Sequence, residues 1–556
     1  MTFTVWSPDA ERVRVRVGGL DHEMRRADGG WWTADVEAPA GTDYAFLLGD
    51  DDTALPDPRS TWQPHGVHGA SRVYDQDAFA WTDREWAGRS LERSVLYELH
   101  IGTFTSGRTF DAAIERLDHL VDLGVDLVEV LPVNSFDGTA GWGYDGVLWS
   151  AVHEPYGGPD GFKRFVDACH ARGLGVVLDV VYNHLGPSGA YLDRFGPYFA
   201  GESDWGPGLN LDGPQSDEVR RYVIDNAMMW FEHFHVDALR LDAVHALVDT
   251  RALPILEELS AETARMSSVL GRPLSLIAES DLNDPRTVRP RSSHGLGMDA
   301  QWSDDLHHAL HVRVTGETDG YYADFAAPGA LAKTLRGAFF HDGTWSSFRG
   351  RTHGRPVDVH ELDGTSFLAY LQNHDQIGNR ATGDRISASI SPDLQACAAA
   401  IVLLGPYTPM LFMGEEWATS TPWQFFASFP DAELAEAVRT GRRREFGRHG
   451  WGESEVPDPM DPATVERSTL DWDELDEPAH AQMLDVYRTL IALRREHPEL
   501  ADPSLADLVV DVAVDDSWLV MHRGRFRVAC RFGDVAPPVE GEIVLELQRV
   551  TVTATA

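Results

Sequence analysis

Arg240 and Asp242 lie two residues apart in the stretch Val236-Asp-Ala-Leu-Arg-Leu-Asp-Ala-Val-His245. Apolar and charged residues alternate here, which is typical of a short β-strand with one polar edge. Side chains repeat every second residue along a strand, so both charged groups share one face. A guanidinium favours the ionised form of a neighbouring carboxyl group, and an ionised carboxylate can act as a nucleophile. An Arg–Asp pair that only stabilises a core has the same pattern, so both interpretations stay open for this stretch alone.

Two further acidic residues follow apolar runs that are typical of strands. Glu279 comes directly after Leu274–Ala278 with no basic residue beside it, and Asp375 lies next to His374 after a later run. Cleavage of a glycosidic bond needs one ionised carboxylate as nucleophile and one carboxyl group with a raised pKa as acid. Asp242 suits the first role. Glu279 suits the second because desolvation favours the protonated form, and Asp375 would bind sugar hydroxyls.

Each of these residues alone has an ordinary structural explanation. An acidic residue at the end of a strand is more often a helix N-cap or a solvated loop residue. Lone histidines such as His184, which ends the stretch Asp179-Val-Val-Tyr-Asn-His184, are more often structural. Three acids and two histidines at the ends of successive strands are harder to explain in this way. We expect His184 and His374 to line one opening as neutral hydrogen-bond donors.

The elements that position these residues alternate between strand and amphipathic helix from about residue 90 onward. The predicted strands are 95–101, 127–133, 175–181, 238–243, 274–278, 367–371 and 410–413, and the predicted helices are 110–123, 161–172, 219–234, 253–270, 392–404 and 480–497. This alternation predicts an α/β fold, a (β/α)8 TIM barrel, in which chemistry sits at the C-terminal ends of the strands. An open doubly wound sheet is the alternative, but no Gly-x-Gly-x-x-Gly turn follows a strand.

Short alternating segments on either side of the barrel predict two β domains. We expect an N-terminal β-sandwich over residues 1–88, the barrel with insertions over 89–498, and a small C-terminal β domain over 499–556. The N-terminal part contains Val13, Val15 and Val17 alternating with arginines, and the pair Trp31-Trp32. The two tryptophans are interpreted as core residues rather than a sugar platform.

Composition narrows the class of protein. The chain has 556 residues, 43% of them hydrophobic, and a formal net charge of -41 from 88 acidic and 47 basic residues. Such a charge argues against nucleic acid or an anionic membrane as a partner and is compatible with a neutral substrate. Cys169, Cys397 and Cys530 are too far apart to predict a disulfide framework or a metal site. The first residues lack a signal-peptide pattern, so we expect a cytoplasmic protein.

Four stretches resemble the signature regions of the α-amylase superfamily (glycoside hydrolase family 13). They are Asp179–His184, Leu239–Asp242, Ala278–Glu279 and Asn373–Asp375, in the family's order and spacing. Further stretches resemble the branch that releases trehalose from maltooligosyltrehalose. These are Gly41–Tyr44, Leu55–Pro64, Leu99–Phe104, Gly141–Gly146, His153–Gly158, Asp299–Asp305, Gln372–Arg380 and Met413–Pro422. The resemblance covers most of residues 1–500.

The resemblance implies a role for each matching residue. Asp242 would be the nucleophile, Glu279 the general acid and then base, and Asp375 the stabiliser of the transition state. Tyr144 would stack beneath the sugar. The other residues expected to bind substrate are Asn183, His184, Arg240, His245, Asp304, Asp305, His308, His374, Gln376 and Asn379. No metal or other cofactor is expected.

The resemblance also implies a reaction and its alternatives. The enzyme would hydrolyse the α-1,4 bond next to the terminal trehalose unit with retention, and would be paired with a maltooligosyltrehalose synthase that supplies this substrate. A glycogen debranching or branching enzyme is the nearest alternative, but the stretch Asp375–Arg380 differs from what those enzymes are expected to carry. A catalytically inactive glucan-binding protein is the alternative from another class, and the presence of all three carboxylates argues against it.

Some weaker candidates have two interpretations. Asp304, Asp305, His307, His308 and His311 have the spacing of a metal cluster, but a polar helix face is favoured. Glu415 and Glu416 would contact distal sugars or cap a helix. Trp205, Trp423, Phe425 and Phe426 are candidates for stacking on sugars, although half of them are expected to be ordinary packing.

Overall fold

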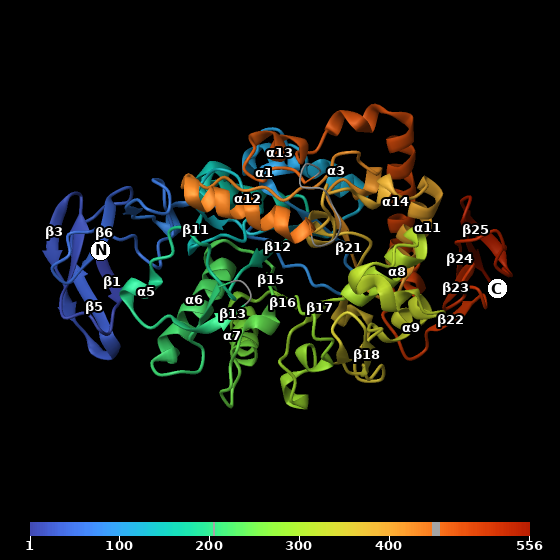
Figure 1. Ribbon diagram of the computed structural model, residues 1–556, viewed down its shortest axis with the longest axis horizontal. Coiled ribbons are helices and arrows are strands. Elements are labelled where there is room, and N and C mark those ends of the chain that lie inside the picture. The colour runs from blue at the N-terminus through green and yellow to red at the C-terminus, as the bar shows by residue number, and fades with distance from the viewer. Residues whose placement is uncertain (204–205, 448–455, 556) are drawn as a thin grey trace.

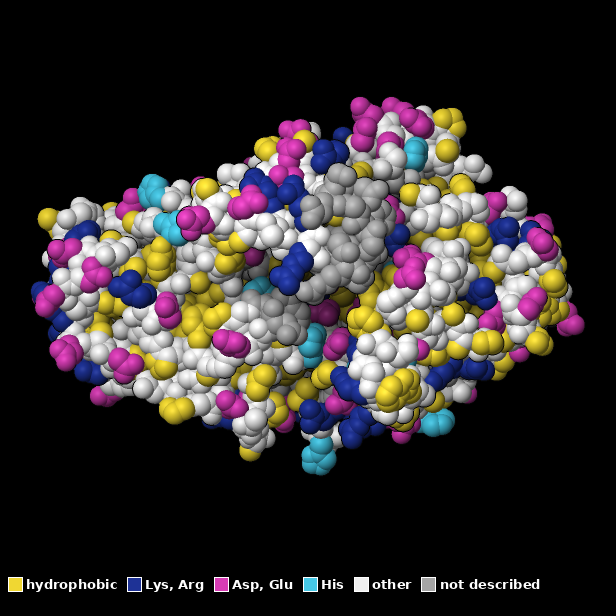
Figure 2. Space-filling model, in the orientation of Figure 1, with side chains coloured by type: hydrophobic (Ala, Val, Ile, Leu, Met, Phe, Trp, Pro, Cys, Tyr) yellow, Lys and Arg dark blue, Asp and Glu magenta, His cyan; other side chains and the backbone are white. Residues whose placement is uncertain are grey.

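The computed structural model describes residues 1–203, 206–447 and 456–555. The molecule is elongated, with the N-terminal sheets at one end, the C-terminal sheet at the other and the barrel between them (Figure 1). Asp and Glu side chains are spread over the face shown in Figure 2, in keeping with the strongly negative net charge. Within the described ranges, no helix is long and apolar enough to cross a membrane.

Among the described residues, eight parallel strands form a closed barrel, which confirms the predicted (β/α)8 fold and excludes the open sheet. In chain order the strands are β8 (Leu96–Leu99), β9 (Leu127–Val130), β12 (Gly175–Val180), β15 (Ala238–Leu241), β16 (Ser275–Ala278), β17 (Ala300–Trp302), β20 (Phe367–Tyr370) and β21 (Thr408–Phe412). Pairing of β21 with β8 closes the barrel. The sequence did not predict β17, because three residues with Gln301 at their centre are too short to show a period.

Each predicted helix except one corresponds to a single helix that covers the barrel, and the helix over 304–315 was expected only as a polar helix face. The covering helices include α4 (Gly158–His170), α6 (Ser216–His233), α7 (Ile255–Leu270), α8 (Asp304–Thr315), α11 (Pro392–Leu404) and α14 (Pro478–Glu496). The single helix expected over 110–123 is two short helices, α2 (Phe110–Ile114) and α3 (Leu117–Leu123). Arg116 lies between them with its guanidinium 4.6 Å from the ring centre of Trp472.

Alternate strand residues divide into two buried layers. One layer fills the barrel and includes Leu96, Leu127, Val177, Ala238 and Ile277. Two residues further along each of these strands, on the same face, stand Glu98, Glu129, Asp179, Arg240 and Glu279. The interior of the barrel is therefore apolar toward the start of the strands and charged toward their ends.

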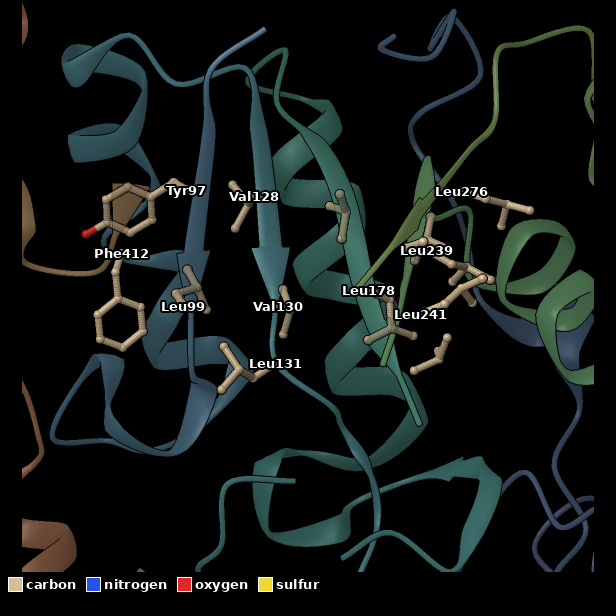
Figure 3. Close-up of a cluster of buried hydrophobic side chains, with 14 of the residues drawn as sticks. Tyr97, Leu99, Val128, Val130, Leu131, Leu178, Leu239, Leu241, Leu276 and Phe412 are labelled. Carbon is tan, nitrogen blue, oxygen red and sulfur yellow. The ribbon is translucent and has the colours of Figure 1, made fainter. Parts of the chain in front are cut away.

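The other alternate residues belong to a larger cluster that also includes helix residues. Leu99, Val130, Leu178 and Leu239 are members of it (Figure 3). Phe162 of α4 belongs to the same cluster. Both faces of these strands are buried, which is why they read as nearly continuous apolar runs.

Two antiparallel sheets precede the barrel. One has the order β1-β5-β4 and the other β3-β2-β6-β7. Their bounds are Thr2–Trp6 (β1), Val13–Val17 (β2), Leu20–Glu23 (β3), Arg25–Arg26 (β4), Trp31–Asp35 (β5), Asp43–Leu48 (β6) and Ser71–Arg72 (β7). Trp32 is buried in their core, whereas Trp31 is half-buried with the Arg59 guanidinium 5.5 Å from its ring centre. Both contacts agree with packing rather than with a sugar platform.

A five-stranded antiparallel sheet of order β22-β23-β24-β26-β25 follows the barrel. Its strands are β22 (Val509–Val512), β23 (Trp518–Arg523), β24 (Phe526–Arg531), β25 (Glu542–Glu546) and β26 (Val550–Ala554). It packs against α11, where the Cys530 thiol lies 3.7 Å from the carbonyl oxygen of Cys397. All three cysteines are buried and free.

Candidate active site

Asp242 and Glu279 are brought together by the register of three neighbouring strands. Leu241 pairs with both Val180 and Ala278, so β12, β15 and β16 end at the same level. The backbone N–H of Asp242 donates to the carbonyl of Val180, and that of Glu279 donates to the carbonyl of Leu241, each at 3.0 Å. The backbone hydrogen bonds between the strands thus continue past the strand ends and place the two carboxyl groups side by side at the C-terminal mouth of the barrel.

The face in Figure 2 is hollowed near its middle, where Asp, Glu and His side chains gather.

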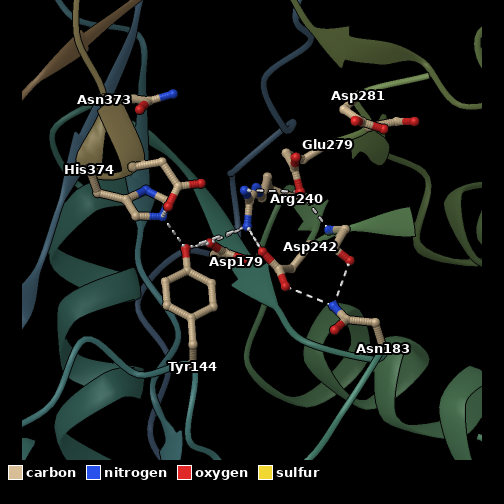
Figure 4. Close-up of polar contacts among 12 residues, drawn as sticks. Tyr144, Asp179, Asn183, Arg240, Asp242, Glu279, Asp281, Asn373 and His374 are labelled. Carbon is tan, nitrogen blue, oxygen red and sulfur yellow. Dashed lines mark hydrogen bonds and ion pairs between the residues drawn. The ribbon is translucent and has the colours of Figure 1, made fainter. Parts of the chain in front are cut away.

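Both carboxylate oxygens of Asp242 are held by donors (Figure 4). Oδ1 accepts a hydrogen bond from Arg240 Nη1 at 2.8 Å, and Oδ2 accepts one from Asn183 Nδ2 at 2.7 Å. Asn183 also donates to the Asp242 carbonyl at 3.0 Å. A carboxylate fixed at both oxygens is oriented for attack, which suits the predicted nucleophile.

Glu279 lies in a different environment. Burial raises the pKa of Glu279 to about 8, and the charges of Asp242, Asp304 and Asp375 act in the same direction, against the opposing effect of Arg240. Its Oε2 accepts a hydrogen bond from the backbone N–H of Ala243 at 2.6 Å and lies 3.7 Å from Arg240 Nη2. Glu279 is therefore protonated at neutral pH, as a general acid must be.

Arg240 lies between three of the acidic side chains (Figure 4). It is fully buried, with Nη1 2.8 Å from Asp179 and from Asp242 and with its guanidinium 4.2 Å from the ring centre of Trp302. The face of an aromatic ring attracts a cation, so it stabilises the guanidinium without a hydrogen bond. The geometry agrees with the predicted support of Asp242 and adds Asp179 as a second partner.

Asp179 and Glu98 are site residues that the sequence reasoning missed. Burial raises the pKa of Asp179 to about 6, with Asp242 adding to the rise and Arg240 opposing it. Asp179 was visible as the first residue of a signature stretch and is the register partner of Arg240. Glu98 is 276 residues from His374, whose ring it contacts, so no local pattern could pair them.

His374 differs from the neutral donor that we expected. Burial lowers its pKa, but Asp375 and Glu98 outweigh burial and raise the pKa to about 9. Its Nδ1 lies 2.5 Å from Glu98 Oε1, and its Nε2 lies 2.8 Å from the Tyr144 hydroxyl. The ring is thus an imidazolium at neutral pH.

His184 agrees with the expectation of a neutral histidine. Burial lowers its pKa, although Asp242 opposes the change. Its Nε2 lies 3.1 Å from the carbonyl oxygen of Tyr144, and its Nδ1 contacts the side chain of Asn183. The Tyr144 ring stacks on His374 with 5.1 Å between ring centres.

Asp375 is the most open of the three predicted carboxylates, with a side chain 42% exposed. It stands in the first turn of α10 (His374–Gly378), and its Oδ1 lies 3.5 Å from His374 Nε2. Asn373 caps this helix through its side-chain oxygen, which accepts from the Gln376 N–H at 2.8 Å. The helix start therefore orients Asp375 toward the mouth.

Of the other predicted substrate-binding residues, Asp304 and Gln376 lie beside the carboxylates. Asp304 Oδ1 accepts hydrogen bonds from the Tyr370 hydroxyl at 2.6 Å and from Gln376 Nε2 at 3.2 Å. Burial raises the pKa of Asp304, and Asp375 adds to the rise. His245 lies 3.9 Å from Asp281, and Asn379 is exposed after the end of α10.

Asp305 and His308 have contacts that point to structural roles. Asp305 Oδ2 accepts hydrogen bonds from the backbone N–H groups of Phe340 and His341 and from Asn283, at 2.7 to 2.9 Å. It anchors a loop, and its contacts do not support the predicted role in substrate binding. The His308 ring lies 4.7 Å from that of Tyr321, and burial lowers the pKa of His308 to about 3.

The histidine face of α8 is satisfied by protein groups. His307 contacts the carbonyl of Leu371 and the hydroxyl of Tyr322, and His311 contacts Glu317 at 2.9 Å. In the described part of the chain, no group of three or more His, Cys, Asp or Glu side chains could hold a metal ion. These contacts support the interpretation of a polar helix face.

Glu415 and Glu416 are buried in the core, so neither side chain is exposed for contact with a sugar. The Tyr487 hydroxyl lies 3.0 Å from Glu415, and His119 lies 2.7 Å from Glu416. Trp423 and Phe426 are also buried, so both are packing residues. Phe425 is half-buried with its ring 5.2 Å from that of Trp142. Trp205 lies outside the described residues.

Known proteins match this chain in sequence and in fold. A family model described as "Alpha amylase, catalytic domain" matches residues 85–205. With the closed barrel, it defines a glycosidase of the α-amylase superfamily. A malto-oligosyltrehalose trehalohydrolase from Mycobacterium tuberculosis is 56% identical over 98% of this chain and 95% of that protein. One from Saccharolobus solfataricus is 42% identical over 89% of this chain and 85% of that protein. The chain belongs to the malto-oligosyltrehalose trehalohydrolase family.

A crystal structure supports the same fold over the whole chain. It is that of a Salmonella typhimurium protein assigned provisionally as an alpha amylase, with a TM-score of 0.92 and 36% identity. The match covers 100% of this chain and 97% of the other.

Proposed function

We propose that this chain hydrolyses the α-1,4-glucosidic bond next to the terminal trehalose of maltooligosyltrehalose, releasing trehalose and a maltooligosaccharide. The observation that carries the proposal is 56% identity over nearly the whole length to a protein named for this reaction. The site geometry adds the chemistry, because Asp242 is held at both oxygens while Glu279 has a pKa of about 8.

In the proposed mechanism, Asp242 attacks the anomeric carbon on the maltooligosaccharide side of the bond. Glu279 donates its proton to the glycosidic oxygen, and trehalose leaves as the C–O bond breaks. Glu279, now a carboxylate, removes a proton from water, which displaces Asp242 and completes hydrolysis with retention. Asp375 and His374 would bind the sugar hydroxyls, and Arg240 would keep Asp242 in position.

Product analysis by chromatography tests this proposal. Maltotriosyltrehalose, maltopentaose and a branched glucan are incubated separately with the protein. We expect rapid release of trehalose from the first and slow action on the other two. Preferential attack on the branched glucan would support a debranching or branching enzyme instead. Binding without turnover of any of the three would support an inactive glucan-binding protein.

The substrate has to be supplied by another enzyme, because maltooligosyltrehalose carries a reducing end converted to a trehalose unit. We therefore infer a functional pairing with a maltooligosyltrehalose synthase, both acting in the cytoplasm. A coupled assay that starts from maltopentaose checks the pairing: trehalose should form only when both enzymes are present.

A further inference from the structure

Glu98 contacts two groups of His374, its imidazole ring and its backbone N–H. It is the third residue of β8, is buried, and points into the charged part of the interior. Its Oε1 lies 2.5 Å from Nδ1 of the His374 ring, and its Oε2 accepts the backbone N–H of His374 at 3.0 Å. One carboxylate thus fixes both the ring of His374 and the start of α10, whose next residue is Asp375.

Two anionic side chains contact the His374 ring, Glu98 at Nδ1 at 2.5 Å and Asp375 at Nε2 at 3.5 Å, so Glu98 is the partner at hydrogen-bond distance. The charged and titratable groups that face it are Glu98 on β8, His100 after that strand, Glu129 on β9, Tyr144, Asp179 on β12, Arg240 on β15 and Asp375 on α10. Burial, with the charge of Glu98 adding to it, raises the pKa of Glu129 well above its usual value, so Glu129 is neutral. Neither oxygen of Glu129 has a hydrogen-bond partner among the described residues.

The hydrogen bonds beyond His374 require a proton on each ring nitrogen. The Tyr144 hydroxyl lies 2.5 Å from Asp179 Oδ2 and 2.8 Å from His374 Nε2. A hydroxyl has one proton to donate. If Tyr144 gives that proton to Asp179, His374 must donate from Nε2 while Nδ1 donates to Glu98. A neutral ring would leave one of these contacts without a proton.

The chain of contacts ends at the nucleophile. Asp179 Oδ2 also accepts from Arg240 Nη1 at 2.8 Å, and the same nitrogen donates to Asp242 at 2.8 Å. Glu98 is therefore connected to Asp375 through the backbone of α10, and to Asp242 through His374, Tyr144, Asp179 and Arg240.

We propose that Glu98 is a positioning residue for the reaction, which keeps His374 doubly protonated and fixes the start of α10 so that Asp375 and the Tyr144–Asp179–Arg240 contacts keep their geometry. This inference deepens the proposed hydrolysis and depends on it only for the kinetic readout. The charge state of the His374 ring can be measured whatever the substrate is.

The first experiment measures that charge state by NMR of protein labelled with ¹⁵N-histidine, with His374→Gln to assign the signal. In the native protein the ring should stay doubly protonated through neutral pH and titrate near pH 9. In Glu98→Gln the titration should move down by roughly two pH units or more, because the amide supplies no charge. Glu129→Gln is the matched control on the next strand, and it should leave the titration in place. An unchanged titration in Glu98→Gln would overturn the proposal.

The second experiment is a double-mutant cycle with maltotriosyltrehalose. Glu98→Gln should lower kcat by roughly 10- to 100-fold, the range expected for loss of a hydrogen bond to a charged group. The same substitution should cost little in the His374→Gln background, because the charge of Glu98 acts through the His374 ring and the new amide oxygen can still accept the backbone N–H of residue 374. Full additivity of the two losses would contradict the proposal. A protein that turns over no trehalosyl substrate would refute the proposed function instead, while the NMR result would still decide the role of Glu98.

A third variant covers the case in which Glu98→Gln does not fold. Glu98→Asp keeps the charge but is shorter by one methylene, so it should not reach both N–H groups at once. We expect a doubly protonated His374 ring at pH 7 together with a lower kcat. Loss of the imidazolium signal, or a native kcat, would count against the proposal.

Discussion

Asp242 and Glu279 end adjacent strands, yet their surroundings assign them opposite chemical states. Arg240 and Asn183 hold both oxygens of Asp242, whereas burial and three neighbouring carboxylates favour the protonated form of Glu279. Arg240 reaches Asp242 at 2.8 Å but Glu279 only at 3.7 Å. The position of one guanidinium therefore separates a nucleophile from an acid within the same cluster.

Glu279→Gln tests this separation through the pH profile. The acid works only while protonated, so kcat/KM of the native protein should fall as pH rises through about 8. The variant should lose roughly 100- to 10,000-fold in kcat, keep its substrate affinity, and lose this basic limb.

Glu415→Gln is the control for that experiment. Burial also raises the pKa of Glu415 to about 8, but this side chain lies in the core beside Tyr487. Its replacement should leave the basic limb in place. If Glu415→Gln removed the limb and Glu279→Gln did not, the assignment of the acid would be wrong.

At the scale of the elements, the sequence predicts the strand ends well where the runs are long and apolar. The apolar runs of β12, β15 and β16 and the period of two along a strand place Asp242, Arg240 and Glu279 correctly. The three-residue strand β17 shows no such period. The role of Glu98 depends on closure of the barrel, which brings β8 beside β21 and within reach of His374, and no local pattern contains that contact.

The start of α10 is an element on which catalysis should depend. Asn373→Ala removes the N-cap of the helix that carries Asp375, so we expect a loss of about 1 kcal/mol in stability together with a lower kcat. Ser391→Ala removes the cap of α11, where Ser391 is exposed and accepts from the Leu394 N–H at 3.4 Å. Ser391→Ala should reduce stability by no more than Asn373→Ala does, and it should leave kcat unchanged. Equal kinetics in the two variants, measured beside thermal unfolding, would show that the cap does not position Asp375.

At the scale of the whole molecule, one buried cation joins the barrel to the segment that leads to the C-terminal sheet. Arg494 of α14 donates to the carbonyl oxygens of Leu403, Gly405, Leu500 and Tyr407 at 2.9 to 3.3 Å. These carbonyls belong to the end of α11, the approach to β21 and the segment that leads to the C-terminal sheet. The exact boundaries of the three domains stay a prediction, but this arginine ties two of them together.

Arg494→Met should therefore destabilise the whole molecule without touching the chemistry. Burial lowers the pKa of Arg494 to about 9, so burying this charge is costly, and the hydrogen bonds to the four backbone carbonyls offset that cost. We expect a loss of at least about 2 kcal/mol in stability, since a buried unsatisfied acceptor costs about 1 to 3 kcal/mol.

Arg488→Met on the same helix is the control, because Arg488 is 38% exposed and lies 4.0 Å from Asp485. Its cost should stay within about 0.5 kcal/mol. Calorimetry should give a clearly lower Tm for Arg494→Met alone, and both variants should keep the native kcat at 25 °C. Equal Tm values would show that Arg494 does not stabilise the protein through these carbonyls.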